Sequence, residues 1–137
     1  MANVLEATIT HEGPRNAVVK ITGVLTDSDY TGTVVTKSQF TSNENVASGS
    51  LVGFRVDCVQ YSVGDPMQVQ LAWDANSPQI LFAFSGHGEL EATHVGGFVP
   101  NRLNSGYNGD ILLTTTGYPA GTTQVFSVIL KLVKLYA

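Results

Sequence analysis

Apolar and polar residues alternate along much of the chain, with the period of a β-strand. The clearest case is segment 67–73, where Val69, Leu71 and Trp73 alternate with glutamine and alanine. This pattern predicts a strand with one buried face, and it assigns Trp73 to the core. Seven further segments predict strands by their alternation or their β-branched residues: 4–10, 17–22, 32–40, 51–63, 80–84, 111–116 and 124–135.

Two of these segments predict more than a strand. In segment 51–63 the alternation assigns one buried face, formed by Val52, Phe54, Val56 and Cys58, with Gln60 as a further candidate. In segment 80–84 every residue is apolar, which predicts a strand covered on both sides.

Short stretches rich in Gly, Pro, Asn and Asp separate the predicted strands. Residues 41–45 and 47–50 predict loops, and Asn108-Gly109 predicts a two-residue hairpin turn before segment 111–116. No segment predicts a helix of three turns. About eight strands with short turns predict an all-β, jelly-roll-like β-sandwich, with a barrel as the alternative. At 137 residues, the chain is predicted to be one domain over 1–137.

Charge is sparse and scattered. Charged residues make up 13% of the chain, the net charge is −4, and Lys and Arg occur singly. A nucleic-acid binder needs a clustered basic face, so we expect no direct nucleic-acid binding. No apolar segment is long enough to predict a membrane span, and the absence of a signal-like N-terminus predicts synthesis in a cytoplasm. Cys58, the single cysteine, is interpreted as a core thiol.

A sparsely charged surface rich in Thr, Ser, Asn and Gln is typical of proteins whose faces contact other proteins. Lectin-like surfaces share this composition, so both interpretations stay open. Tyr107 and Tyr118 lie in predicted turns and are candidate contact residues for either kind of partner.

One cluster merits consideration as a metal site. If segment 86–94 is extended, His87, Glu89 and Glu91 share one face and offer an imidazole and two carboxylates. The competing interpretation is a solvent face whose opposite side buries Leu90 and Ala92. We favour the latter, because metal ligands usually converge from more than one strand, and we therefore predict no metal site.

Catalytic motifs are absent from the sequence. There is no Gly-x-Ser-x-Gly elbow and no glycine-rich phosphate loop. Asp27 and Asp29 form a carboxylate pair of the kind that glycosidases use, but their Thr-Ser-Asp context is typical of a turn. We expect no catalytic residues, no cofactor and no enzymatic activity.

The N-terminal sequence MANVLEATITHEGPRN, residues 1–16, resembles the start of small virion proteins of tailed phages. In size and strand density the whole chain is similar to their cement, or head decoration, proteins. This resemblance implies a β-sandwich or jelly roll that binds the major capsid protein on the outside of the assembled head. It further implies a homo-oligomer, often a trimer, that clamps neighbouring capsomers without enzymatic activity or cofactor.

Three hypotheses follow. The leading one is a capsid cement protein located on the virion exterior, in which residues 2–10, with Asn3, Val4 and Leu5, reach a neighbouring subunit. The second is a tail or baseplate β-sandwich component. The third is a carbohydrate-binding module that uses Tyr107, Tyr118 and the glycine-rich loops.

Overall fold

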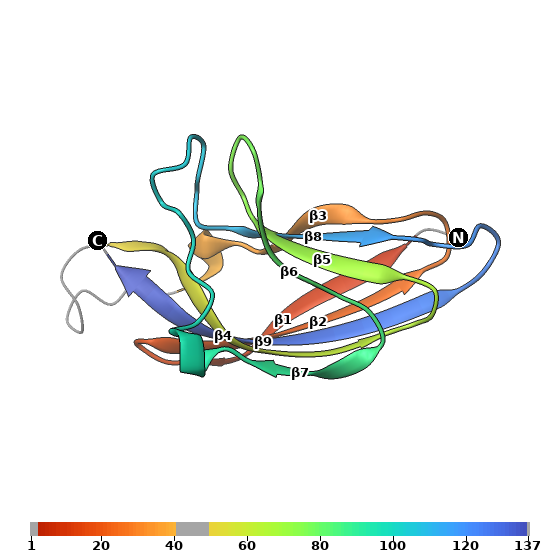
Figure 1. Cartoon of the computed structure of the whole chain (residues 1–137), viewed down its shortest axis with the longest axis horizontal. Helices are drawn as coiled ribbons and strands as arrows, with labels where there is room; N and C mark the ends of the chain where they lie inside the picture. Colours follow the sequence, from red (N-terminus) through yellow and green to blue (C-terminus); the bar gives the residue numbers. More distant parts are fainter. Residues whose placement is uncertain (1–2, 41–49, 137) are drawn as a thin grey trace.

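The structure is a computed structural model that describes residues 3–40 and 50–136. Nine strands in two antiparallel sheets make up most of these residues (Figure 1). The five-stranded sheet has the order β1-β2-β9-β4-β7, and the four-stranded sheet has the order β3-β8-β5-β6. The strands are β1 (Val4–Glu12), β2 (Asn16–Leu25), β3 (Thr31–Val35), β4 (Leu51–Val63), β5 (Gln68–Trp73), β6 (Gln79–Phe84), β7 (His87–Glu91), β8 (Ile111–Thr116) and β9 (Gln124–Tyr136). The prediction of an all-β sandwich is confirmed.

The strand pairing is nested. β2 pairs with β9, β3 with β8, β4 with β7 and β5 with β6, all antiparallel. These four pairs are those of one long hairpin whose two arms are β2 to β5 and β6 to β9. The additional β4–β9 and β5–β8 pairs join the arms into two sheets. A rolled hairpin of eight strands is a jelly roll. β1 lies outside the nested set and extends the five-stranded sheet beside β2.

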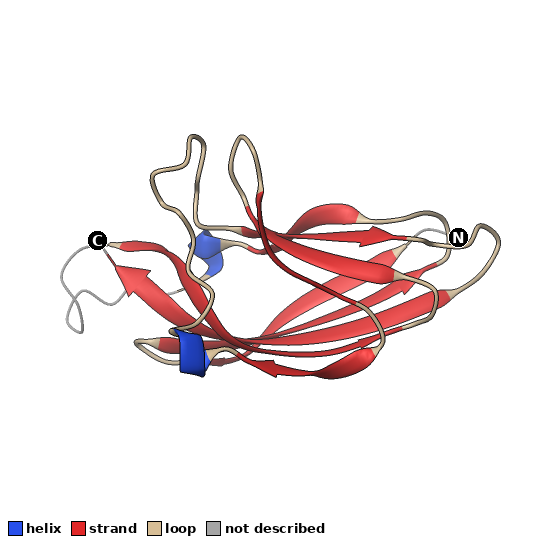
Figure 2. Cartoon of the chain, in the orientation of Figure 1, coloured by secondary structure: helices blue, strands red, loops and turns tan. Residues whose placement is uncertain are grey.

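Helical structure within the described residues is confined to two one-turn 3₁₀ helices, Lys37–Gln39 and Thr93–Val95, drawn blue in Figure 2. None of the helices in this part of the chain has the length and apolar character needed to cross a membrane. The loop predicted at 41–45 and most of the loop predicted at 47–50 lie outside the described residues.

A single hydrophobic cluster fills the space between the sheets, and alternation along the strands supplies it. Trp73 on β5 is 2% exposed, which confirms the core role predicted for it. The largest fully buried side chains are Phe54, Phe126, Ile21, Leu25, Met67, Leu71, Ile111, Leu113, Leu130 and Leu132.

The predicted buried face of β4 is correct at Phe54 and Val56 and wrong at Val52 and Gln60, which are only partly buried. Cys58 is buried as predicted, with an exposed fraction of 1%, but it lies outside the core cluster. The register with β9 shifts between Val56 and Cys58, so Asp57 is an extra residue in a β-bulge. A bulge changes which side each following residue faces. Val59 and Val63 therefore join the core, and Cys58 lies on the outer side, beside Lys131 of β9.

β6 also differs from its prediction. It is an edge strand of the four-stranded sheet, covered on its inner face only. Leu81 and Phe84 are buried, whereas Ile80 is 66% exposed and Ala83 is exposed. The apolar run of this strand therefore leaves apolar side chains on the surface.

Asn108-Gly109 does not form the predicted hairpin. Gly109 has a φ of 90°, which suits glycine, but a long loop rather than a strand precedes it. This loop carries the chain from β7 in one sheet to β8 in the other. Figure 1 shows it beside the β5–β6 loop, both standing away from the sheets.

Candidate functional site

The charged residues of the strands are segregated between the sheets. The four strands of the four-stranded sheet, with sequences TGTVV, QVQLAW, QILFAF and ILLTTT, contain no charged residue. We call the outward side of this sheet the uncharged face. Alternation and exposure assign to it Thr31, Thr33, Gln68, Gln70, Ala72, Ile80, Ala83, Leu112, Thr114 and Thr116.

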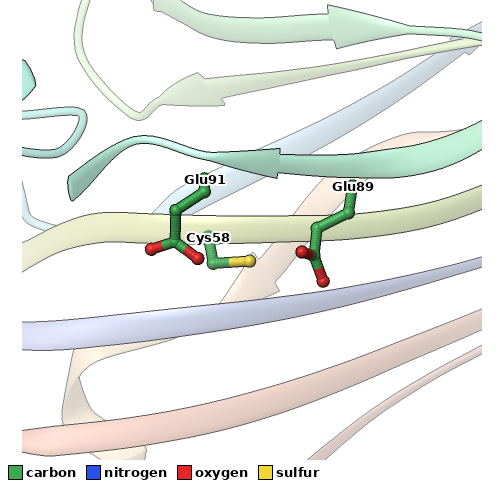
Figure 3. A group of neighbouring side chains, drawn as sticks. All are labelled: Cys58, Glu89 and Glu91. Atoms are coloured by element: carbon green, nitrogen blue, oxygen red, sulfur yellow. The ribbon is translucent and has the colours of Figure 1, made fainter. Parts of the chain in front are cut away.

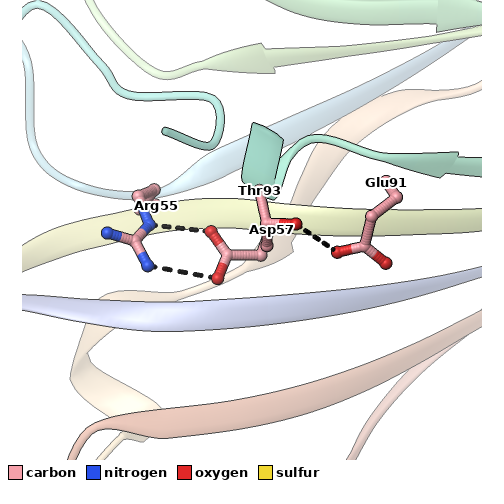
Figure 4. Close-up of polar contacts among 4 residues, drawn as sticks. All are labelled: Arg55, Asp57, Glu91 and Thr93. Atoms are coloured by element: carbon pink, nitrogen blue, oxygen red, sulfur yellow. Dashed lines mark hydrogen bonds and ion pairs between the residues drawn. The ribbon is translucent and has the colours of Figure 1, made fainter. Parts of the chain in front are cut away.

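The five-stranded sheet carries all of the strand charges in the described residues, mainly on its outer face. There Arg55 binds Asp57 with Nε–Oδ1 at 2.7 Å and a second hydrogen bond at 3.1 Å (Figure 4). This bidentate bond raises the pKa of Arg55. Lys20, on β2, is exposed on the same face.

A row of exposed valines crosses one end of that face. Val4, Val24 and Val125 lie side by side on β1, β2 and β9, with exposed fractions of 63%, 39% and 56%. Of the predicted N-terminal contact residues, Val4 is thus available on the surface. The side chain of Asn3 is used within the chain, because its oxygen accepts hydrogen bonds from the backbone N–H groups of Thr26 and Asp27. Leu5 packs against the core.

The metal hypothesis can be compared with the geometry of β7. His87, Glu89 and Glu91 are exposed on one face, as the solvent-face interpretation requires; of the two residues predicted to be buried opposite them, Ala92 is buried and Leu90 is half-buried. The group with ligand atoms within 4.8 Å of one another consists of Glu89, Glu91 and Cys58, without His87 (Figure 3). Sequence reasoning missed Cys58 because the β4 bulge turns it outward.

The chemistry of this cluster favours a protonated thiol. Burial raises the pKa of Cys58, and the nearby carboxylates of Glu89 and Glu91 raise it further. The carboxylates have donors of their own: Gln60 donates to Glu89, and the Thr93 hydroxyl donates to Glu91 at 3.0 Å (Figure 4). Metals bind the thiolate, so an ion at this cluster would have to displace the thiol proton. The hydrogen bonds of the two carboxylates make the cluster part of the sheet surface.

The two candidate tyrosines have different environments. Tyr118 donates its hydroxyl to the Thr122 carbonyl at 2.5 Å, and its N–H is bound by Asp29 at 3.1 Å, so it stabilises its own turn. Tyr107 lies in the β7–β8 loop, with its hydroxyl buried against Gly53. That hydroxyl has no hydrogen-bond partner among the residues that the structure describes.

A cavity of about 650 Å³ opens beside Tyr107, and we call it the loop cavity. Its walls come from segments far apart in the sequence, so no local motif predicted it. The lining residues are Lys37, Val52, Pro100, Asn101, Arg102, Leu103, Tyr107 and Asn108. Among the lining residues, the sequence had indicated only Tyr107 as a candidate contact residue.

The fold and these surfaces define the class: a jelly-roll β-sandwich with an uncharged sheet face and a cavity beside the β7–β8 loop. Comparisons with protein-family models, with curated proteins and with solved structures give no significant match.

Proposed function

We propose that this chain is a non-enzymatic structural protein of a phage virion that binds the outside of the assembled capsid and stabilises contacts between capsomers. The observation that carries the proposal is the uncharged face of the four-stranded sheet. The resemblance of residues 1–16 to the start of small virion proteins, together with the similarity of the chain to cement proteins in size and strand density, favours the capsid as the partner.

The uncharged face is suited to being covered by protein. Burying a charged side chain costs far more free energy than burying a threonine, a glutamine or an alanine. The central parts of protein interfaces are accordingly depleted of charged residues. The four-stranded sheet presents threonine, glutamine and alanine with the apolar Ile80 and Leu112, so a partner can cover it without desolvating an ion.

A cement protein stabilises a shell by linkage. Because it binds the assembled state and not the separated subunits, its binding free energy adds to the stability of the shell. A stable contact buries about 1,000 Å² or more of surface. One sheet face and its flanking loops can supply part of this area, and an oligomer presents that face several times.

The decisive experiment places one charge at the centre of the uncharged face. Thr114 lies between Thr31 and Gln70 in the sheet, so Thr114→Lys introduces an ammonium group there. Thr22→Lys is the matched control, because Thr22 has similar exposure on the outer face of the five-stranded sheet, between Glu6 and Ser127.

Binding is measured by co-sedimentation of each purified protein with phage heads assembled without it. We expect wild type and Thr22→Lys to sediment with the heads and Thr114→Lys to remain in the supernatant. Equal binding of both variants would reject the uncharged face as the contact. Failure of the wild type to bind heads, with binding to purified tails instead, would replace the capsid proposal with the tail alternative.

A further inference from the structure

The β7–β8 loop supplies most of the lining of the loop cavity, and hydrogen bonds to β6 and to the β5–β6 loop hold it in place. Gln79 and Asn101 bind one another reciprocally, with Gln79 Nε2 donating to the Asn101 carbonyl at 3.0 Å and the Asn101 N–H donating to Gln79 Oε1 at 2.9 Å. The Asn76 N–H donates to the Ser105 carbonyl at 2.9 Å. A pocket whose walls are already ordered loses little conformational entropy when a ligand binds.

The described lining of this cavity contains two cationic side chains, Lys37 and Arg102, and no carboxylate. Neither the ammonium group of Lys37 nor the guanidinium group of Arg102 has an ion-pair partner among residues 3–40 and 50–136. Asp110, outside the lining, accepts the Lys37 backbone N–H at 2.8 Å. In a chain of net charge −4, this is a local site for an anionic group.

The remaining walls fit a polyol with an apolar side. Asn101 uses its side-chain oxygen to accept the Leu103 N–H, and its amide nitrogen has no partner among the described residues. Val52, Pro100 and Leu103 supply apolar surface, and Leu103 is 95% exposed. The volume of about 650 Å³ is that of a small-molecule site and far exceeds a simple inorganic anion.

We propose that the loop cavity binds an acidic saccharide, with Lys37 and Arg102 contacting its carboxylate, Asn101 donating to a hydroxyl, and Leu103 covering the apolar side of the sugar ring. This site is separate from the uncharged face and does not rest on the capsid proposal.

The test is calorimetric titration of the full chain with defined probes. The acidic probes are glucuronate, galacturonate and N-acetylneuraminate, the neutral probes are glucose and galactose, and sodium sulfate is the inorganic anion. We expect saturable binding of at least one acidic sugar and tighter binding of it than of its neutral counterpart or of sulfate.

The variants assign the site. Arg102→Gln and Lys37→Gln should each weaken binding about tenfold or more, because each removes a charge-assisted hydrogen bond. Lys20→Gln is the control, since it removes the same charge from an exposed position on the five-stranded sheet. Thermal melts of all variants show whether they are folded.

Three results would overturn the proposal. The first is no binding of any acidic sugar at millimolar concentration. The second is equal affinity for a control probe. Equal affinity for neutral sugars would show that the acidic group is not recognised, and equal affinity for sulfate would show that the site binds simple anions and not a saccharide. The third is unchanged affinity in a folded Arg102→Gln variant.

Discussion

Tyr107 and Gly53 are coupled through the buried hydroxyl described above. A methyl group on residue 53 would meet the Tyr107 hydroxyl oxygen first and the ring carbon that carries it at 3.3 Å. The glycine therefore makes room for a polar atom that has no hydrogen-bond partner among the described residues. Unpaired polar atoms in the interior reduce stability, so this pair of positions is a place where the protein can be stabilised.

We predict that Tyr107→Phe raises the free energy of unfolding by about 1 kcal/mol, since it removes an unpaired buried hydroxyl. Gly53→Ala should lower it by about 1–3 kcal/mol through the collision. The double variant should regain most of that loss. Urea denaturation monitored by tryptophan fluorescence measures all three, and additive effects in the double variant would contradict the coupling.

Cys58 predicts a decline in stability at alkaline pH. Its pKa is raised above the ordinary value of 9.0 in the folded state, so the folded protein keeps a proton that the unfolded chain has already lost. Stability is therefore full below pH 9.0 and falls as pH rises through the raised pKa. Tyr107, whose pKa is also raised by burial, adds to the decline at higher pH.

Urea denaturation at pH 7, 9 and 10 tests this. We expect Cys58→Ala to show a shallower decline than wild type between pH 9 and 10, whatever its stability at pH 7. Alkylation of native Cys58 by iodoacetamide at pH 8 should be slow and should become fast in urea. An identical pH dependence in wild type and Cys58→Ala would show that the thiol does not titrate differently on folding.

At the scale of elements, β1 is an addition to a complete jelly roll. The nested pairs from β2 to β9 do not include it. It is attached through Leu5 and Ile9, through its hydrogen bonds to β2, and through the ion pair of Glu12 with Lys134 of β9 at 2.7 Å, which a deletion of residues 2–10 leaves in place. Gly23 makes this attachment possible, because a Cβ there would collide with Phe126 and Leu5.

We predict that a variant lacking residues 2–10 still folds and loses about 2–4 kcal/mol of stability, from the burial of Leu5 and Ile9. Circular dichroism and urea denaturation measure the two quantities. Because the deletion bares the edge of β2, gel filtration must show that the variant is not aggregated. Loss of the β-sheet spectrum would contradict the view of β1 as an addition. If β1 also reaches a neighbouring capsid subunit, the folded variant loses head binding.

The sequence predicted the positions of the strands better than it predicted which side chains of each strand are buried. Alternation, β-branched residues and an apolar run located eight of the strands, although the strand predicted at 32–40 ends at Val35; β7 was considered only as a conditional extended segment because glycines surround it. The predicted face of β4 failed at Val52 and beyond Val56, since the register with β9 shifts at both places and such shifts leave no mark in composition. The loop cavity could not be predicted from the sequence for a different reason. Lys37 of its lining and Asp110, which follows the lining residue Asn108 closely, are 73 residues apart, and only the fold brings them together.

At the scale of the whole molecule, the prediction concerns oligomeric state. We expect a solution mass near three times 14.6 kDa, as a preformed clamp at a threefold position would require. Light scattering coupled to gel filtration measures it directly. A mass of one chain would contradict a preformed trimer and would require the protein to oligomerise on its target.

The segregation of charge between the two sheets also sets how contacts respond to ionic strength. A contact made through the four-stranded sheet involves no ions in its strands and should persist in molar salt. A contact made through the outer face of the five-stranded sheet involves lysines and glutamates and should weaken as the Debye length shrinks. A salt titration of any complex formed by the unmodified protein therefore identifies the sheet that makes the contact.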